Sequence, residues 1–477
     1  MRYISTRGEM PAQDFLLTVL SGLAPDGGLT MPESYPRFSK QKLNEFSKLS
    51  YRDLAFEIIS QFADDVPSED LREIINRSYS EKIFCNGRNP EKSVEITPVI
   101  KLDDTLFIQE LSNGPTLAFK DLAMQFLGNI LEYVLSKKNE KINILAATSG
   151  DTGSAAEYAM KGKSAINVFM LSPAGKMSPF QRAQMYSIQE KNIHNIAVKS
   201  MFDGCQDLVK AVNKDENFKQ KYKIGAVNSI NWGRIAAQIV YYFKGYFAAA
   251  DETGETVDFC VPCGNFGNIC AGHIAKQMGL PIGRLIVATN ENDVLDEFFS
   301  TGKYAPRNES QTIATSSPSM DISKASNLER FVFDSLDRSP KKLKELWKKI
   351  DDGGSFVLEP ESLEEIRKKY GFVSGKSTHA DRISAISEVY SKFGICIDTH
   401  TADSFTVAQK MRNASIKTIV LETASAVKFE ESFFEATSVK LLRPNQFENI
   451  ENLPQRLQTI EPNLQILKNY IEKNALN

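Results

Sequence analysis

The chain has 477 residues, and its 57 lysines and arginines nearly balance its 60 aspartates and glutamates, which leaves a net charge of −3. This balance gives no reason to expect binding to nucleic acid or to an acidic membrane, and no apolar run of about 18 residues predicts a transmembrane helix. Six cysteines without regular spacing and a start unlike a signal peptide indicate a soluble cytoplasmic protein, which we expect to be a monomer or homodimer.

Residues 1–95 mix helical and irregular stretches and are expected to form an α+β region. The next segment contains GPTLAFKD at residues 114–121, followed by LAMQFLGNILEYVL, whose apolar spacing predicts a helix with a broad buried face. Lys120 therefore stands at the start of a core helix. It is either a lysine that keeps its ammonium in water or a desolvated amine that acts as a nucleophile.

From residue 141 onward, strands alternate with helices. Examples of the predicted strands are INILAA, INVFMLS, NIHNIAV, VDFCVP, RLIVATN and IKTIVLE. Repeated strand–helix units predict the α/β class, with parallel-type sheets covered by helices. Ligands of such sheets bind beyond the carboxyl ends of the strands, so the polar loops at these ends are the candidate sites.

The first such loop lies in ATSGDTGSAAEYA, residues 147–159, ahead of a predicted helix. Hydroxyls and free amides at a helix start suit a carboxylate or a phosphate. The alternative is that Asp151 or Ser154 simply caps the helix.

The second loop lies in CGNFGNICAGHIAKQMG, residues 263–279, after the strand VDFCVP. Gly264 and Gly267 let the backbone approach a ligand, and successive amides at a helix start form an anion site. The loop matches neither a Walker motif nor GxGxxG, so a phosphate without a nucleotide is favoured over a nucleotide. The alternative is an ordinary tight turn.

Cys260 and Cys263 have CxxC spacing at the end of the same predicted strand. No second pair completes a zinc site, so we interpret both as small buried residues and predict no metal. A nucleophilic lysine, a phosphate loop and a carboxylate loop on a parallel scaffold together suggest pyridoxal phosphate and an amino-acid substrate.

Ordered blocks over most of the chain resemble the threonine synthase family of fold-type II pyridoxal-phosphate enzymes. They include GLAPDGGLTMPE (22–33), GPTLAFKD (114–121), ATSGDTGSAA (147–156), NSINWGRIAAQIVYY (228–242), GNFGN (264–268) and SPSMDISKASNLER (317–330). The resemblance implies a lyase of threonine biosynthesis that makes L-threonine and phosphate from O-phospho-L-homoserine and water, by γ-elimination followed by β-replacement.

The resemblance also implies roles for individual residues. Lys120 would be the catalytic Schiff-base residue. Glu422 and Thr423, in LETASAVKF, point to opposite faces of a strand, so only one can face the cofactor ring. The resemblance selects Thr423 as the partner of the pyridine nitrogen, and the alternative is that Thr423 merely packs at the strand end. The other implied cofactor residues are Phe119, Gly264, Asn265, Phe266, Gly267 and Asn268. The substrate residues are expected to be Thr148, Ser149, Gly150, Asp151 and Thr152, with Lys176, Ser178, Arg182 and Asn231 as candidates for the leaving phosphate.

The sequence departs from the family pattern at two places. Many members have Phe-His where this chain has Ser112 and Asn113, and His-Pro where it has Ser425 and Ala426. Both departures are expected near the site and concern substrate contacts rather than the cofactor. A related phospho-lyase that forms no threonine is the alternative enzyme, and a cofactor-binding carrier is the non-enzymatic alternative.

The resemblance and the strand pattern together predict a division of the chain. The expected parts are an N-terminal region (1–95), a large cofactor domain (96–140, 228–335 and 391–450), a small α/β domain (141–227), a charged helical insertion (336–390) and a C-terminal helix (451–477).

Overall fold

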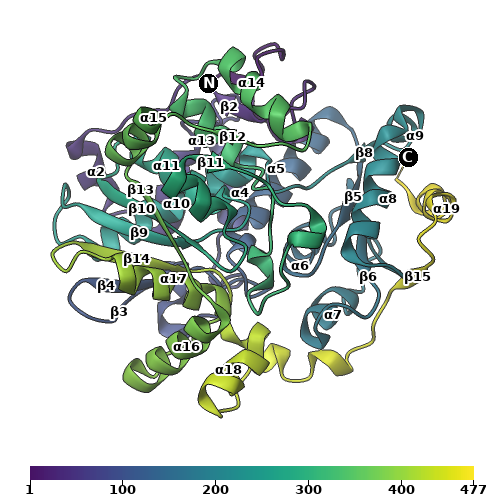
Figure 1. Ribbon diagram of the computed structural model, residues 1–477. Helices are drawn as coiled ribbons and strands as arrows, with labels where there is room; N and C mark the ends of the chain where they lie inside the picture. Colours follow the sequence, from purple (N-terminus) through teal and green to yellow (C-terminus); the bar gives the residue numbers. More distant parts are fainter. Residues whose placement is uncertain (477) are drawn as a thin grey trace.

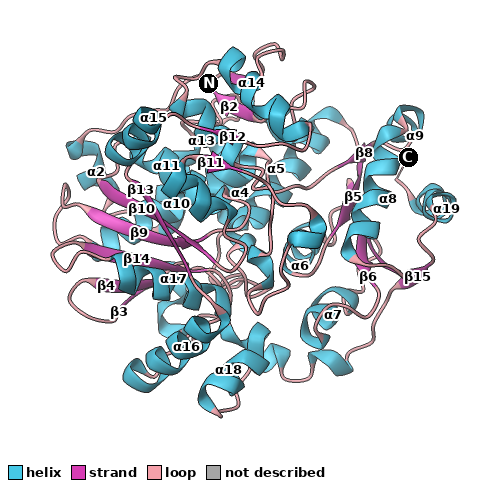
Figure 2. Ribbon diagram, viewed as in Figure 1, coloured by secondary structure: helices cyan, strands magenta, loops and turns pink. Residues whose placement is uncertain are grey.

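The computed structural model describes residues 1–476 and contains two main sheets surrounded by helices (Figures 1 and 2). The larger sheet has the strand order β13-β10-β9-β14-β4-β3, and the smaller sheet has the order β15-β7-β6-β5-β8. Neighbouring strands in both sheets are parallel, apart from the antiparallel pair β3 and β4. The predicted α/β class with two parallel-type sheets is confirmed.

The strands of the larger sheet are β3 (Val99–Lys101), β4 (Leu106–Glu110), β9 (Val257–Pro262), β10 (Ile282–Thr289), β13 (Phe372–Lys376) and β14 (Lys417–Glu422). Those of the smaller sheet are β5 (Ile142–Ala147), β6 (Ile166–Pro173), β7 (Ile193–Val198), β8 (Ile224–Gly225) and β15 (Gln458–Ile460). Two short antiparallel pairs join β1 (Tyr3–Ser5) to β2 (Thr30–Pro32) and β11 (Lys303–Tyr304) to β12 (Phe356–Val357).

The α-helices in the first half of the chain are α1 (Phe15–Ser21), α2 (Lys40–Phe46), α3 (Tyr51–Ile59), α4 (Ser68–Ser78), α5 (Lys120–Lys138), α6 (Asp151–Met160), α7 (Pro179–Tyr186), α8 (Phe202–Lys214), α9 (Glu216–Lys221) and α10 (Trp232–Ala249). Those in the second half are α11 (Gly267–Gln277), α12 (Val294–Thr301), α13 (Leu328–Ser335), α14 (Pro340–Asp351), α15 (Pro360–Glu365), α16 (His379–Phe393), α17 (Thr399–Met411), α18 (Glu430–Thr437) and α19 (Leu464–Asn474).

Helix α5 begins where the chain turns sharply after β4. The carboxylate of Asp121 closes this turn, because it accepts the N–H of Thr116 at 2.8 Å and the hydroxyl of Thr116 at 2.7 Å. The apolar side chains that follow are buried as predicted, and burial of a leucine or phenylalanine side chain stabilises the fold by about 1.5–3 kcal/mol. The helix ends at Asn139, which adopts a left-handed conformation with φ 51°.

Helices cover both sheets and join them. Helix α17 packs on β9, β10 and β14, while α8 packs on β5 and β6. Helix α5 follows β4 of the larger sheet, and α6 follows β5 of the smaller sheet. These two helices pack on each other. In the described part of the chain, residues 1–476, no helix combines the length and the apolar character needed to cross a membrane.

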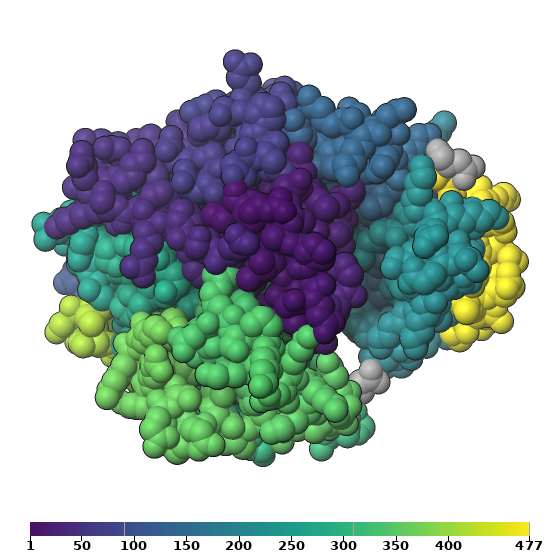
Figure 3. Space-filling model, turned by 90° about the horizontal axis from the view of Figure 1, so that it is seen from above, coloured from purple at the N-terminus to yellow at the C-terminus, as the bar shows by residue number. Residues whose placement is uncertain are grey.

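The N-terminal region contains the β1–β2 pair and helices α1–α4. Helices α3 and α4 pack on α10 and α5, respectively. Figure 3 shows this segment, in purple, spread over one side of the molecule next to the green segment of α14 and α15. Ion pairs join the two segments, including one between Arg7 and Asp351 at 3.2 Å.

Three short strands lie in segments for which the sequence predicted helices. The charged segment 336–390 holds α14 and α15, but it also supplies β12, which pairs with β11, and β13, which pairs with β10 at the edge of the larger sheet. The segment 451–477 supplies β15, which pairs with β7, ahead of α19. The proposed domain boundaries stay a prediction.

Candidate active site

Lys120 lies in the wall of a cavity of about 700 Å³, into which the loops after β5, β9 and β14 open. Its side chain is 12% exposed, and its Nζ lies 3.4 Å from the carboxylate of Asp151 and 3.4 Å from the hydroxyl of Ser319. Burial lowers the pKa of Lys120, against the opposing effect of Asp151. The neighbouring cations Lys428 and Arg234 lower this pKa further. These surroundings favour the desolvated amine over a lysine that keeps its ammonium in water.

The loop Gly264–Asn268 lines the same cavity. Phe266 is left-handed with φ 64°, and α11 begins directly after it. The first amides of a helix have no acceptor within the helix, so this loop offers donors to an anion. Asn268 accepts the hydroxyl of Tyr241 at 2.6 Å, while its buried Nδ2 has no partner in the described part of the protein.

The loop after β5 is held in shape by its own side chains. The hydroxyl of Thr148 accepts the N–H groups of Gly150 at 3.0 Å and of Gly153 at 2.9 Å. Gly150 has φ 148°, and a Cβ at this position would lie 2.7 Å from the side-chain amide of Gln181. The predicted residues of this loop that line the cavity are Thr148, Ser149, Asp151 and Thr152.

Asp151 does not cap α6, which begins without a side-chain cap after Gly150. Its carboxylate instead contacts Lys120 and also lies 2.8 Å from the hydroxyl of Ser319 and 2.6 Å from the Nζ of Lys428. Burial raises the pKa of Asp151, but Lys428 and Lys120 outweigh burial and hold it well below the usual range. The loop therefore carries a stable negative charge next to Lys120.

Thr423 follows β14 directly and lines the Lys120 cavity. Its carbonyl accepts the N–H of Phe119 at 2.9 Å, which fixes it against the turn that carries Lys120. Its own N–H donates to the hydroxyl of Thr401 at 3.3 Å.

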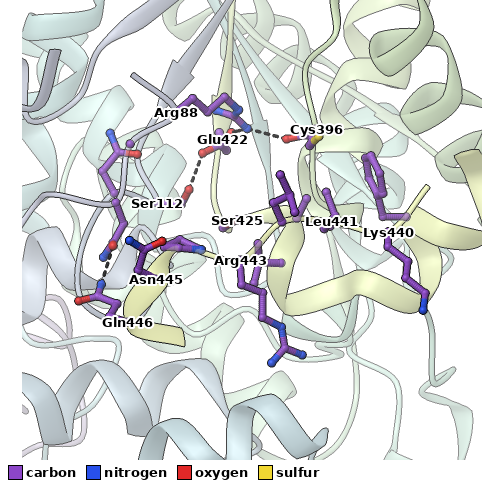
Figure 4. Close-up of a pocket in the computed structure, with 18 of the residues that line it drawn as sticks. Arg88, Ser112, Cys396, Glu422, Ser425, Lys440, Leu441, Arg443, Asn445 and Gln446 are labelled. Carbon is purple, nitrogen blue, oxygen red and sulfur yellow. Dashed lines mark hydrogen bonds and ion pairs between the residues drawn. The ribbon is translucent and has the colours of Figure 1, made fainter. Parts of the chain in front are cut away.

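Glu422 faces away from the Lys120 cavity and lines a second cavity of about 840 Å³ (Figure 4). Its carboxylate accepts the hydroxyl of Ser112 and pairs with the guanidinium of Arg88, which also reaches Glu110 at 2.7 Å. Burial raises the pKa of Glu422 to about 7, although Arg88 opposes this. Thr423 and Glu422 thus face different cavities, as the alternation along a strand predicts.

The two departures from the family pattern also line this second cavity. Ser112, Asn113, Ser425 and Ala426 all belong to its wall, and none of them lines the Lys120 cavity. The expectation that these departures concern substrate contacts is therefore not supported by their position, because they lie behind the strand end that carries Thr423.

Sequence reasoning missed Arg234, in α10. Its side chain is buried and lines the Lys120 cavity, and neither its Nε nor its Nη1 has a hydrogen-bond partner among the described residues. Burial lowers the pKa of Arg234 to about 10. An unpaired buried guanidinium is costly, so this group indicates a site for an anion. The block NSINWGRIAAQ contained the residue, but nothing in the sequence showed that it lacks a carboxylate partner.

His400 and Ser319 were missed as well, and both line the cavity. The Nε2 of His400 accepts the backbone N–H of Ser319 at 3.1 Å, and its Nδ1 lies 2.7 Å from the carboxylate of Asp398. A backbone N–H can only donate, so His400 is the Nδ1–H tautomer. This ring holds the Ser319 loop against Lys120.

The residues expected at the leaving phosphate are not brought to the cavity wall. Neither Lys176, Arg182 nor Asn231 is among the residues that line it. Asn231 is buried and caps α10, since it accepts the N–H of Gly233 at 2.9 Å, and Ser178 caps α7. Their proposed contacts with the substrate phosphate stay a prediction.

Cys260 and Cys263 are free, buried thiols at the end of β9. Burial raises the pKa of Cys260 to about 12 and raises that of Cys263 strongly. Within residues 1–476, no group of three or more histidine, cysteine, aspartate or glutamate side chains is placed to hold a metal ion.

Three family models match the chain. They describe the N terminus of threonine synthase (residues 2–79), a pyridoxal-phosphate-dependent enzyme (residues 91–345) and the C-terminal part of threonine synthase (residues 401–471).

Similar proteins match over almost the whole length. The threonine synthase of Methylobacillus glycogenes is 57% identical over 471 residues, which cover 99% of this chain and 99% of that protein. The threonine synthase of Corynebacterium glutamicum is 49% identical, with 99% of this chain and 98% of that protein covered. The crystal structure of threonine synthase from Brucella melitensis with bound pyridoxal phosphate is 36% identical, covers 100% of both chains and has a TM-score of 0.94. The yeast enzyme structure is 36% identical, covers 99% of this chain and 98% of its own, and has a TM-score of 0.92.

Proposed function

The chain belongs to the threonine synthase family of pyridoxal-phosphate-dependent enzymes, and we propose that the Lys120 cavity is where it converts O-phospho-L-homoserine and water into L-threonine and phosphate. The observation that carries this assignment is that two particular side chains line the same cavity. A desolvated lysine, Lys120, lines the same space as Arg234, a buried guanidinium whose Nε and Nη1 have no hydrogen-bond partner among the described residues.

The residues of this cavity fit pyridoxal phosphate. The loop Gly264–Asn268 would hold its phosphate group through the free amides at the start of α11, and the unpaired Nδ2 of Asn268 is a further donor. Lys120 would hold its aldehyde carbon, with Phe119 beside the ring. When bound, the cofactor supplies the electron sink that stabilises negative charge next to the amino-bearing carbon of the substrate.

The substrate needs two anion sites besides the cofactor phosphate loop. We assign its carboxylate to the loop Thr148–Thr152, whose hydroxyls and amides lie at the start of α6. We assign its phosphate to Arg234 together with Asn228 and Ser229, which line the same cavity. A guanidinium donates to phosphate through several N–H groups at once, which suits a group that must also leave as an anion.

Lys120 would also move the protons of the reaction. Its neutral Nζ would remove a proton from the substrate Cα and then one from Cβ, while Arg234 holds the phosphate that departs from Cγ. A proton returned to Cγ would form the methyl group, after which the hydroxyl of water adds at Cβ and a proton returns to Cα to give threonine. The lowered pKa of Lys120 supports this role, because a general base must be unprotonated near neutral pH.

Thr423 would donate its hydroxyl hydrogen to the pyridine nitrogen. A hydroxyl leaves that nitrogen neutral, whereas a carboxylate would protonate it. Glu422 faces the second cavity and is paired there, which supports Thr423 as the partner.

The related proteins favour threonine formation over elimination alone. A carrier without activity would have no use for an unprotonated lysine next to an anion site, and Lys120 and both loops are intact here.

One assay tests the proposal directly. The purified protein, loaded with pyridoxal phosphate, is given O-phospho-L-homoserine, and phosphate and threonine are measured together. Equal amounts of the two products are expected. Phosphate without threonine would identify a phospho-lyase instead, and the absence of both would refute the assignment.

We further propose a cytoplasmic enzyme that is a monomer or homodimer and acts on a small molecule rather than on nucleic acid. All six cysteines are free, which supports a reducing compartment, and the net charge of −3 gives no basis for binding nucleic acid.

A further inference from the structure

Lys428 is a buried lysine that lies next to the proposed site without lining its cavity. Lys428 follows β14 in the block LETASAVKF, and its side chain is 0% exposed. Its Nζ lies 2.6 Å from Oδ1 of Asp151 and donates to the carbonyl of Thr116 at 2.9 Å. A lysine is almost never fully buried unless it is paired, so the contact with Asp151 accounts for its position.

Asp151 is shared between two lysines. Its Oδ2 faces Lys120 at 3.4 Å, while its Oδ1 faces Lys428 and also accepts from Gln181 at 3.2 Å. Lys120 lines the ligand cavity and Lys428 does not. Lys428 therefore cannot touch a ligand in that cavity, and any effect it has must pass through Asp151 or through the loop of Thr116.

The two lysines differ in what happens to their charge. Lys120 must give up its proton to bind the cofactor and to act as a base, so it is not a lasting counter-ion for Asp151. A buried carboxylate that loses its only cation takes up a proton, because burial disfavours the charged form. Lys428 does not line the ligand cavity and takes no part in cofactor attachment, so its contact with Asp151 remains when Lys120 becomes neutral.

We propose that Lys428 is a positioning residue that serves as the permanent counter-ion of Asp151 and thereby leaves Lys120 free to lose its proton. This inference rests on the proposed function of Lys120. The other charged or titratable groups that face this cluster are Arg234, on the cavity side, His400, behind Ser319, and Asp121, whose carboxylate is held by Thr116.

Lys428 also ties three segments together. It comes from the segment after β14, Asp151 begins α6, and Thr116 lies in the turn ahead of Lys120. These segments supply, respectively, the proposed ring partner Thr423, the carboxylate loop and the reactive lysine. Loss of the Lys428 charge is therefore expected to change the pKa of Lys120 while leaving the phosphate loop Gly264–Asn268 intact.

The test measures how pyridoxal phosphate becomes attached to the apoenzyme. Only the neutral amine of Lys120 condenses with the cofactor aldehyde, forming a C=N bond and releasing the aldehyde oxygen as water. The rate of attachment is followed by absorbance from pH 6 to pH 10, and the attached residue is identified by borohydride reduction and peptide mapping. These readouts do not depend on turnover.

In Lys428→Met the full charge of Asp151 acts on Lys120, so the pKa of Lys120 rises. Attachment should be at least tenfold slower than in the wild type at pH 7.5, and the difference should shrink towards pH 10. Lys428→Arg should keep most of the wild-type rate. The matched control is Lys163→Met, which removes a lysine that is 12% exposed and paired with Glu132 at 2.8 Å but does not line the cavity. This variant should attach the cofactor normally.

The double variant Lys428→Met with Asp151→Asn removes both charges and should bring the pH midpoint of attachment back towards the wild type. It also replaces Lys428→Met if the single variant does not fold. An unchanged midpoint in Lys428→Met, a rate reduced equally at every pH, or no recovery in the double variant would overturn the inference. If the wild type attaches the cofactor to another lysine, the proposed function fails instead, which keeps the two failures distinct.

Discussion

Two cavities meet at the carboxyl end of β14, and they differ in how their buried polar groups are paired. The cavity of Glu422, about 840 Å³, is the larger, and Arg88 in its wall is paired with Glu422 and Glu110. The cavity of Lys120, about 700 Å³, contains an unpaired guanidinium at Arg234. Buried polar groups are normally satisfied, so unpaired ones need a partner from outside the chain. The smaller cavity is thus built for a ligand, while size alone would have selected the larger one.

The largest effect is expected at Lys120, the group that distinguishes the ligand cavity chemically. Lys120→Ala removes both the attachment point and the base, so turnover should fall by about 10³-fold or more. Threonine formation measured against time checks this. Near-wild-type turnover in this variant would show that Lys120 is neither the attachment point nor the base.

Arg234 and Arg88, one arginine from each cavity, give a direct test of the comparison. Arg234→Met should lower kcat/KM for O-phospho-L-homoserine by about 10²–10³-fold, because a charged donor to the departing phosphate is lost. Arg88→Met, its matched control in the other cavity, should leave KM almost unchanged. It should instead lower the free energy of unfolding by about 3 kcal/mol, since two buried carboxylates lose their shared partner. Steady-state kinetics and denaturant unfolding separate the two outcomes, and a reversed pattern would exchange the roles of the cavities.

Glu422 makes the paired cavity sensitive to pH. Its pKa in the folded protein is raised to about 7, mainly by burial, so between the unfolded value and pH 7 the folded state binds more protons than the unfolded state. The stability that protonated Glu422 contributes is present at low pH and is lost as the pH rises through 7. Unfolding free energy should therefore fall more steeply from pH 5 to pH 8 in the wild type than in Glu422→Gln. Parallel curves for the two proteins would contradict this.

The smallest effect is expected at Thr423. Thr423→Val should keep the cofactor bound and slow turnover several-fold, because one hydrogen bond of about 1 kcal/mol is lost. Thr418→Val is the control, since Thr418 is buried near the start of the same strand and is not among the residues that line the Lys120 cavity. Equal turnover in both variants would remove the assigned role of Thr423.

The features that the sequence predicted well are those encoded locally. The alternation of strands and helices, the polar loops at strand ends and the lysine at the start of α5 all follow from short patterns. The structure brings Lys120, the loop Gly264–Asn268 and four residues of the loop after β5 into one cavity, namely Thr148, Ser149, Asp151 and Thr152. The opposite orientation of Glu422 and Thr423 also follows from the alternation of side chains along a strand.

The features that were missed depend on which distant residues meet. Arg234 matters because its Nε and Nη1 have no hydrogen-bond partner among the described residues, and Lys428 matters because Asp151, far away in the chain, lies beside it. The short strand β13 follows a charged stretch that was predicted to be wholly helical. The partners of a buried side chain and the pairing of an edge strand depend on residues far apart in the chain, so a local sequence pattern cannot predict them.

The most direct measurement is the site of covalent attachment. The enzyme loaded with pyridoxal phosphate is reduced with borohydride, digested and mapped by mass spectrometry. The account predicts one cofactor per chain, on the peptide that contains Lys120. An adduct on Lys440, the lysine that lines the Glu422 cavity, or on any other lysine would contradict the assignment of the two cavities.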